Sequence, residues 1–485
     1  MSTPLRPNLL SCATVLLVTG AAVGAACSPS KGGGAKRGAG THAGASAADA
    51  GATADAGDMD TFSRPLPPAS RTVAVWSDQL DKDLTDAQIR FAAEHLVGSQ
   101  KLAASTSARL RAINPGFLVL QYRLASGLST VPNLVGRDAW IRDTLEPGAP
   151  PSAGMTAPEE SYYLHAPPKD GPRVVHADGY FLADVRNEAW QKWQTAEIMR
   201  RMPLNDFDGV FLDTSHLRTD GFTPDDWYKS FCDPDVTHLA NCWTPPATET
   251  FQTLVATLHG GPVRYHAIGN FGPLTTIWDP DDYLSPLDGG MIELFMWQHG
   301  PLNEADWHIS AARILKLCGN DRVMIAQPVG VPLADGEGRR FVLGSFLLLQ
   351  GHHGFASFYP EGTESVGAPV WLPEYDLDLG RPVEPLPATL GALCSAGATA
   401  RSCEGVYTRR YERGLVYVNP ADAARTITLP APPAGKRWVD LGFTGGGYVD
   451  AAGKPASGEI VQSESPQSEF SVSPHGARIF RMIPR

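Results

Sequence analysis

Eight short apolar runs, many of them followed by a polar residue, dominate the chain between residues 71 and 387. Helical stretches with apolar residues three and four positions apart separate the later runs. Eight strands with helical crossovers predict an α/β fold, the (β/α)8 TIM barrel. The predicted strands are Thr72–Trp76, Leu96–Ser99, Phe117–Gln121, Gly209–Asp213, Arg264–Gly269, Gly290–Leu294, Arg322–Gln327 and Gly354–Tyr359. The predicted helices are Asn187–Met202, Glu249–His259, Ala305–Leu317 and Arg339–Gln350.

After Pro387 the pattern changes to shorter β-like runs separated by turn signals such as Asn419-Pro420. We therefore divide the folded part into a catalytic barrel over residues 71–387 and a small antiparallel, β-sandwich-like domain over residues 388–485. The runs in the second domain are Gly405–Arg410, Gly414–Val418, Thr426–Leu429, Arg437–Asp440 and Glu469–Arg481.

The first 70 residues predict an export signal followed by a tether. Residues 1–27 resemble a bacterial lipoprotein signal, with Arg6 before an apolar stretch and small residues before Cys27, which would carry the lipid. Gly24 stands where such signals usually have Leu, so a plain secretory signal is the alternative. Residues 28–70 are rich in Ala, Gly and Ser and predict a flexible tether. We expect an exported protein of the bacterial cell envelope, lipid-anchored and touching the membrane only through that lipid.

Cysteine spacing agrees with export. Cys232 with Cys242 and Cys394 with Cys403 each bracket a short loop and predict two disulfides, which leaves Cys318 free. No Cys-x-x-Cys or suitably spaced His pattern appears, so we expect neither a metal nor a cofactor. The 40 basic and 52 acidic residues give a net charge of −12, which argues against nucleic acid as a partner. The oligomeric state is left open.

Barrels display their chemistry at the carboxyl ends of their strands, and two carboxylates end apolar runs there. Asp213 ends the fourth predicted strand, and Glu293 lies in the sixth. Apolar surroundings raise the pKa of a carboxyl group, which is how general acids arise; the alternative for Asp213 is a helix cap or a pair with Arg. Polar and aromatic side chains at or near the strand ends predict substrate contacts: Trp76, Asp78, Tyr122, Arg123, Asn270, Trp297, Gln327 and Tyr359.

Four segments, DFDGVFLDTS, RYHAIGNFG, GGMIELF and GLVYVNP, resemble the glycosyl hydrolase-like 15 family, which is distantly related to endo-α-1,4-polygalactosaminidases. The resemblance covers roughly Arg71 to Val418 and implies a barrel that hydrolyses glycosidic bonds. It places the strand-four aspartate at Asp213 and the strand-six acid at Glu293, where related barrels often use Asp. Another group of barrel glycosidases carries its second carboxylate on strand seven, but that strand ends here in Ala326-Gln327-Pro328.

These observations favour an exported glycoside hydrolase that cleaves a poly- or oligosaccharide, with retention preferred to inversion. Family analogy implies Asp213 as nucleophile and Glu293 as general acid/base, whereas sequence alone permits the reverse. The alternative is a non-catalytic carbohydrate-binding surface lipoprotein on the same barrel. Only the enzyme requires the two carboxylates to face each other across the barrel mouth, so their separation distinguishes the two hypotheses. The sugar and the linkage are left open.

Overall fold

The computed structural model describes residues 62–67, 72–80, 83–128, 158–166, 171–174, 181–203, 206–215, 240–275, 284–360, 367–394, 406–464 and 469–485. The predicted signal, with Cys27, and the tether as far as residue 61 lie outside these ranges. None of the described helices is long and apolar enough to cross a membrane.

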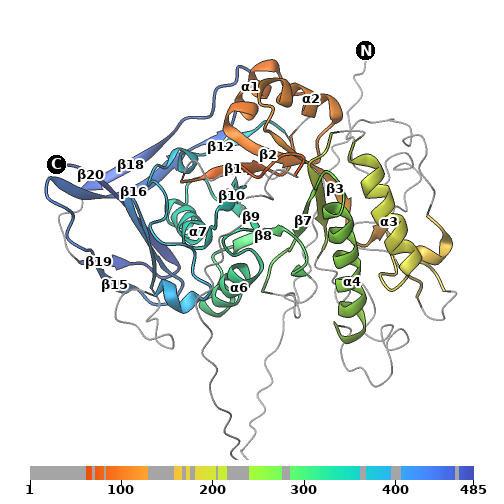
Figure 1. The fold of residues 1–485 in the computed structure, drawn as a ribbon. Helices are drawn as coiled ribbons and strands as arrows, with labels where there is room; N and C mark the ends of the chain where they lie inside the picture. The colour runs from red at the N-terminus through yellow and green to blue at the C-terminus, as the bar shows by residue number, and fades with distance from the viewer. Residues whose placement is uncertain are drawn as a thin grey trace, which may run out of the picture. The chain divides into compact units, whose positions relative to one another are not determined.

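A closed parallel barrel of eight strands is the centre of the fold (Figure 1). The last strand pairs with both the seventh and the first, which closes the barrel. Every predicted strand overlaps one of these eight, so the predicted TIM barrel is confirmed. In order around the barrel they are β1 (Ala74–Ser77), β2 (Leu96–Gln100), β3 (Leu118–Leu124), β6 (Gly209–Asp213), β7 (His266–Asn270), β8 (Gly289–Gln298), β9 (Val323–Val331) and β10 (His353–Ala356).

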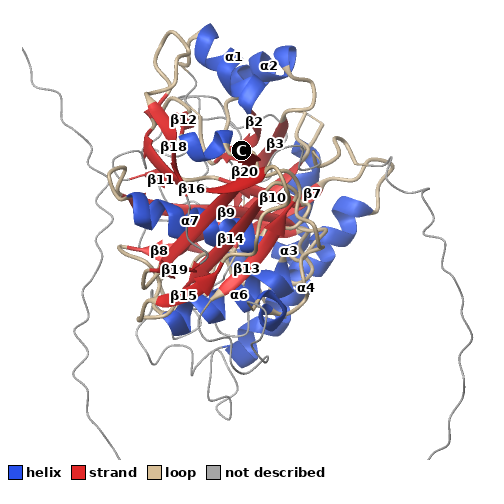
Figure 2. Ribbon diagram, turned by 90° about the vertical axis from the view of Figure 1, so that its left-hand side faces the viewer, coloured by secondary structure: helices blue, strands red, loops and turns tan. Residues whose placement is uncertain are grey.

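The helices lie around these strands (Figure 2). The four predicted helices are present, although α4 begins earlier than predicted and contains Pro245 and Pro246. Two further helices, α1 and α2, were not predicted; α1 begins with a capping box in which Thr85 and Gln88 satisfy each other's backbone N–H groups. The helices are α1 (Asp86–His95), α2 (Ala104–Ile113), α3 (Glu188–Arg201), α4 (Ala240–His259), α6 (Glu304–Leu317) and α7 (Gly336–Leu349).

Successive strand residues alternate between the inside and the outside of the barrel, and the large side chains at the inward positions fill its interior. Trp76 and Phe355 stack inside at 6.1 Å, and Phe211 stacks on Tyr122 at 6.3 Å. Gly98 makes room for the indole, since a Cβ on this glycine would lie 2.4 Å from a ring carbon of Trp76. The strands are therefore mostly apolar, although β3 and β9 also contain the buried Gln121 and Gln327.

The predicted antiparallel domain is also present. Its main sheet has the order β13-β14-β20-β16-β18, and the pair β15–β19 packs with it around Trp438 and Phe480. The strands are β13 (Tyr407–Tyr411), β14 (Gly414–Asn419), β15 (Arg425–Thr428), β16 (Lys436–Gly445), β18 (Gly458–Glu464), β19 (Glu469–Val472) and β20 (Gly476–Pro484). Minor elements are β4 (Gly127–Leu128), β5 (Phe181–Leu182), β11 (Tyr359–Pro360), β12 (Val370–Trp371), β17 (Gly447–Tyr448) and the 3-10 helices η2 (Glu160–Tyr162), η4 (Pro373–Asp376) and η5 (Leu390–Leu393).

Helix α7 joins the barrel to this second sheet. It contacts β8 and β9 on the barrel and β13, β14, β16 and β20 on the sheet (Figure 1). All its residues from Gly338 to Leu349 are buried. Arg339 near its start forms a buried two-pronged ion pair with Glu374 of η4, with both N–O distances 2.6 Å. The helix is thus a core element of both parts.

Residues 62–67 belong to the fold, although the sequence assigns them to the flexible tether. Phe62 bridges to Arg264 next to β7 and stacks on His266 at 4.3 Å. Arg64 forms ion pairs with Asp206 at 2.9 Å and with the fully buried Asp208 at 2.6 Å. The composition of the tether changes at Arg71, but the contacts with the barrel begin earlier, at Phe62.

The cysteines are described only in part. Cys318 is free, as predicted; it is also buried, and burial raises the pKa of its thiol to about 12. Cys394 is disulfide-bonded, but Cys403 lies outside the described residues. Neither Cys232 nor the side chain of Cys242 is described. Both predicted pairings therefore stay predictions.

Candidate active site

Asp213, Asn270 and Glu293 meet at the mouth of the barrel, at the carboxyl ends of three neighbouring strands. The amide nitrogen of Asn270 lies 2.8 Å from Oδ1 of Asp213 and 3.0 Å from Oε2 of Glu293. The two carboxylate oxygens are therefore no more than 5.8 Å apart, the sum of those two distances. Both predicted carboxylates thus face the same small space.

The orientation of Asn270 is fixed by its own oxygen. The backbone N–H of Gly272 donates to Oδ1 of Asn270 at 3.0 Å, so the NH2 group must face the carboxylates. Because an amide carries two hydrogens, it can serve both acids at once. Asn270, predicted as a substrate contact, is buried and acts here as a bridge between the acids.

Asp213 accepts hydrogen bonds from three donors. Tyr122 of β3 donates its hydroxyl hydrogen to Oδ2, and Asn270 donates to Oδ1. The third donor is the backbone N–H of Thr214, 2.8 Å from Oδ1, and Thr214 has a left-handed φ of 55°. An ionised carboxylate only accepts hydrogen bonds, so this set of donors suits the charged form of Asp213.

Glu293 is in a different environment. Burial, and then the negative charges of Asp213 and Asp78, raise the pKa of the Glu293 carboxyl, while Asn270 and Lys101 act in the opposite direction. The residue after it, Leu294, has a left-handed φ of 59°. Non-glycine residues in this conformation concentrate at functional sites. The site therefore contains one carboxyl group whose pKa is raised beside one whose oxygens accept three hydrogen bonds.

A second polar group lies at the ends of β1 and β2. Gln100 accepts a hydrogen bond from the indole N–H of Trp76 and donates one to Asp78. The ammonium of Lys101 lies 3.0 and 3.2 Å from the two Asp78 oxygens and 5.0 Å from the centre of the Tyr122 ring. Gln100 and Lys101 were missed from the sequence; the available signal concerned only Gln100, a polar residue directly after the second predicted strand.

Two other predicted residues border the same space. The hydroxyl oxygen of Tyr359 accepts the backbone N–H of Asp78 at 3.0 Å, and burial raises the pKa of this phenol, which keeps it protonated. Gln327 is buried on β9, in register with Glu293 of β8. These residues complete the walls around the two acids.

The structure does not bring Arg123 or Trp297 to the carboxylates. Tyr122 points into the barrel, so its neighbour Arg123 points outward, where it lines a small hollow with Trp190 of α3. Trp297 is buried and packs on Gly338 of α7, whose Cβ position lies 2.7 Å from the indole ring. Both residues support the frame of the barrel.

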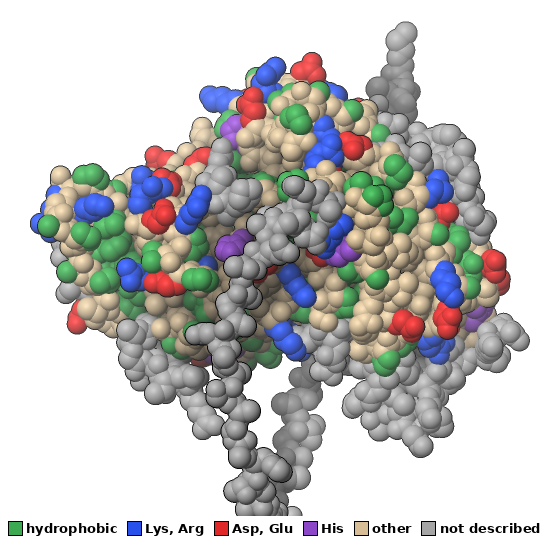
Figure 3. Space-filling model, viewed as in Figure 1, with side chains coloured by type: hydrophobic (Ala, Val, Ile, Leu, Met, Phe, Trp, Pro, Cys, Tyr) green, Lys and Arg blue, Asp and Glu red, His purple; other side chains and the backbone are tan. Residues whose placement is uncertain are grey.

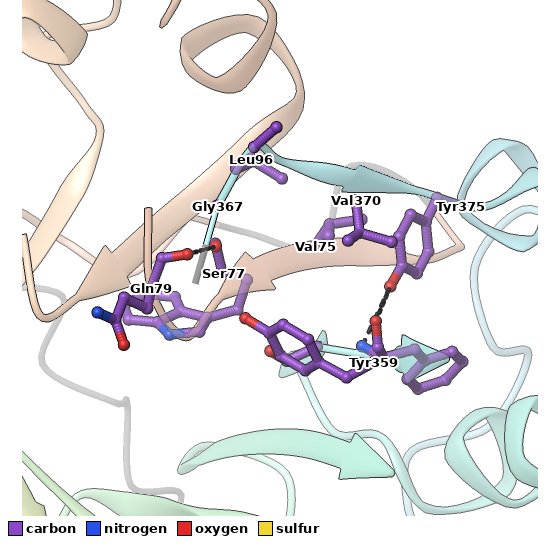
Figure 4. A pocket seen from close by; sticks show the side chains of 12 residues that line it. Val75, Ser77, Gln79, Leu96, Tyr359, Gly367, Val370 and Tyr375 are labelled. Atoms are coloured by element: carbon purple, nitrogen blue, oxygen red, sulfur yellow. Dashed lines mark hydrogen bonds between the residues drawn. The ribbon is translucent and has the colours of Figure 1, made fainter. Parts of the chain in front are cut away.

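A pocket with an empty volume of about 380 Å³ lies between β1 and the segment after β10 (Figure 4). Val75, Tyr359, Val370 and Tyr375 are among the residues that line it, and neither Asp213 nor Glu293 does. It lies next to the site without containing the two acids, so it is not the place where the chemistry would occur.

The surface and the arrangement of possible metal ligands add two observations. Acidic and basic side chains are interspersed over the face in Figure 3, with no broad patch of either sign. Among the described residues, no group of three or more His, Cys, Asp or Glu side chains could hold a metal ion.

Solved structures similar to this chain include several sugar-processing proteins. A mutant of MutB in complex with the substrate sucrose matches with 13% identity and a TM-score of 0.45, covering 86% of this chain and 100% of that one. The α-amylase of Geobacillus thermoleovorans complexed with acarbose matches with 9% identity and a TM-score of 0.37. This match covers 85% of this chain and 99% of that one. The cycloisomaltooligosaccharide glucanotransferase of Paenibacillus sp. matches with 10% identity and a TM-score of 0.36. The match covers 85% of this chain and only 55% of that protein.

The comparison with curated proteins found no match. The comparison with protein families matches residues 111–415, well over half of the chain, to the family described as hypothetical glycosyl hydrolase family 15. This range contains Tyr122, Asp213, Asn270 and Glu293. Together with the closed barrel and the pair of acids at its mouth, the match identifies a carbohydrate-active barrel enzyme, and the chain belongs to hypothetical glycosyl hydrolase family 15.

Proposed function

We propose that this enzyme hydrolyses O-glycosidic bonds of a poly- or oligosaccharide with retention of anomeric configuration. The observation that carries the proposal is the shared amide of Asn270, which limits the distance between Oδ1 of Asp213 and Oε2 of Glu293 to 5.8 Å or less. Retaining glycosidases hold their two carboxyl groups about 5–5.5 Å apart, whereas inverting enzymes need about 6.5–9.5 Å to place a water molecule between acid and sugar. The limit lies below the inverting range.

The contacts of the two acids support the following roles. Asp213, with three donors on its oxygens, attacks the anomeric carbon, while Glu293 gives its proton to the departing glycosidic oxygen. This forms the bond between sugar and Asp213 and breaks the glycosidic bond. Glu293, now ionised, takes a proton from water, and the resulting hydroxide attacks the anomeric carbon and releases Asp213 as a carboxylate. The proton on Glu293 and the charge on Asp213 are restored.

The binding-only alternative needs the same aromatic side chains but no second acid. A protein that only binds sugar has no reason to place Glu293 beside Asp213 in a half-buried site, because two neighbouring carboxylates there repel each other. The close pair therefore favours catalysis over binding alone.

The cellular place of the enzyme is a second part of the proposal. We infer export and attachment through a lipid on Cys27, from the signal-like sequence before it and the tether after it. Mass spectrometry of the N-terminal peptide from membrane fractions tests this, with Cys27→Ala as the control. A soluble, unmodified N-terminus in the parent protein contradicts lipidation.

The decisive experiment for the activity has two stages. The purified protein is first incubated with a panel of α- and β-linked polysaccharides, and products are resolved by mass spectrometry. Asp213→Asn and Glu293→Gln are then compared with Asp321→Asn, a control whose carboxylate is exposed and paired with His352. We expect the first two variants to lose turnover by about 10³-fold or more and the control to keep it.

Azide rescue distinguishes the two roles. Azide can replace the missing nucleophile in Asp213→Ala and gives a glycosyl azide of inverted configuration. In Glu293→Ala, azide attacks the sugar bound to Asp213 and gives the retained configuration. The opposite pattern reverses the assignment, and wild-type turnover in both amide variants excludes this pair.

A further inference from the structure

Lys101 has no role in the proposed mechanism, although it lies close to the acids. Its ammonium contacts both oxygens of Asp78, at 3.0 and 3.2 Å, and lies 5.0 Å from the centre of the Tyr122 ring. The same Tyr122 donates its hydroxyl hydrogen to Asp213. Lys101 therefore connects the polar group at the ends of β1 and β2 to the proposed nucleophile.

The backbone places this side chain in an unusual way. Successive strand residues point to opposite sides, and Gln100 already points to Asp78, so Lys101 is expected to point away. It has instead a φ of 58°, in the left-handed region, and its ammonium also reaches Asp78. For a residue other than glycine this conformation costs about 1 kcal/mol or more. The fold accepts that cost at a strand end that faces the acids.

The charges at the mouth explain what the cation does there. Asp78, Asp213 and Glu293 are three acids in a poorly hydrated space, and the Asp78 and Lys101 side chains are 19% and 18% exposed. Burial alone would lower the pKa of Lys101, but Asp78, Asp213 and Glu293 raise it, so the ammonium stays charged. The charged groups that face Glu293 are thus two carboxylates, Asp213 and Asp78, which raise its pKa, and one cation, Lys101, which lowers it.

We propose that Lys101 is a positioning residue for catalysis, whose ammonium balances the acids at the barrel mouth and holds Asp78 and the Tyr122 ring in place for the reaction at Asp213. The inference rests on the proposed glycosidase function and deepens it. It makes the protonation of Glu293 depend on two residues of opposite charge. Loss of Lys101 favours the protonated acid, and loss of the charge on Asp78 favours the ionised one.

The test compares variants that should move the pH profile of the activity in opposite directions. Lys101→Met and Lys101→Gln remove the cation, and both should move the alkaline limb of the kcat/KM profile to higher pH by about one unit. Asp78→Asn should move the same limb to lower pH. Lys101→Arg keeps the charge, and its limb should stay near that of the parent. Lys192→Met is the matched control, because this exposed lysine on α3 pairs with Glu188 and not with an acid of the site.

A second readout does not depend on turnover. Titration of 13C-labelled glutamate, with the Glu293 signal assigned by its loss in Glu293→Gln, should show the same opposite shifts. These shifts in a protein without glycosidase activity would support the role of Lys101 and contradict the proposed function. Shifts of the same sign, or none, in folded variants at both positions overturn the inference, even if the parent is an active glycosidase. If both charge-removing variants at 101 fail to fold, an Asp78→Asn titration without a downward shift overturns it as well.

Discussion

Tyr122 donates its hydroxyl hydrogen to Oδ2 of Asp213 from the neighbouring strand of the barrel. The ring cannot turn freely, because Phe211 stacks on it and Lys101 lies over it. The position of the proposed nucleophile is therefore set by Tyr122 of β3, Phe211 of β6 and Lys101, which follows β2. A change that removes only the hydroxyl of Tyr122 should alter the rate more than the stability.

Tyr122→Phe tests this relationship. The substitution keeps the ring and removes one hydrogen bond to a charged group, which is worth about 1.5–3 kcal/mol. We expect kcat/KM to fall by about 10- to 100-fold with little change in melting temperature. Tyr448→Phe, on the exposed β17, is the control and should keep the parent rate. A parent-like rate in Tyr122→Phe would show that the bond has no catalytic role.

Asn270→Ala should change both the rate and its pH dependence. Hydrogen bonding from Asn270 stabilises ionised Glu293, so its removal raises the pKa of Glu293. The mechanism needs protonated Glu293, and activity is lost as pH rises through that pKa; the alkaline limb should therefore move to higher pH by up to about one unit. The maximal rate should fall, because the two acids lose their common donor.

The pH profile of kcat/KM checks this prediction. Asn303→Ala is a suitable control, because Asn303 caps α6 and should affect only stability. A limb that moves to lower pH in Asn270→Ala contradicts the assignment of Glu293 as the acid.

Arg64→Ala should destabilise the protein. Asp208 is fully buried and accepts from Arg64, Arg111 and the backbone N–H of Val119, so losing one cation leaves its charge poorly balanced. We expect a loss of about 2–3 kcal/mol in the free energy of unfolding, measured with urea. Arg437→Ala, which breaks an exposed pair with Glu464, should cost about 1 kcal/mol or less.

The same contacts predict where the chain can be shortened. A protein that starts at Ala56 should melt like one that starts at Cys27, whereas one that starts at Arg71 should melt at a lower temperature, because it lacks Phe62 and Arg64. Equal melting temperatures for the two would show that these contacts contribute little.

Arg339→Met should be more damaging than Arg64→Ala. It leaves Glu374 buried without its partner, in a place where burial already raises the pKa of that carboxyl despite Arg339. Breaking such a pair from one side costs about 3–5 kcal/mol. The double variant Arg339→Met, Glu374→Leu should recover much of this loss, and urea unfolding of the three proteins measures the difference. No recovery would mean that packing, not charge, dominates.

The sequence predicted the barrel well because its strands are buried on both faces. Gly209–Asp213 was predicted with the bounds that the structure has, since four apolar or small residues precede a carboxylate. The sixth strand was predicted only to Leu294, yet β8 runs to Gln298. Left-handed residues at Leu294 and Met296 bend it, and no sequence pattern marks them.

Side-chain alternation along a strand indicates which residues face the inside of the barrel, except where the backbone departs from the strand conformation. Asp213 and Glu293 are brought together as expected. Alternation along the third strand could have placed Arg123 outside the barrel, because its neighbour Tyr122 points inward. The position of Lys101 could not have been predicted in this way, because it depends on a positive φ at a residue that is not glycine.

Helix α7 has a consequence for how such proteins can evolve. Its buried surface is shared, and Gly344 approaches β20 so closely that a Cβ there would lie 2.7 Å from that of Ala477. Recombination that exchanged only the C-terminal sheet would bring a foreign surface against a helix shaped for this one. The unit that can be inherited intact is therefore the sheet together with α7, and the genetic boundary between modules falls inside the barrel rather than after it.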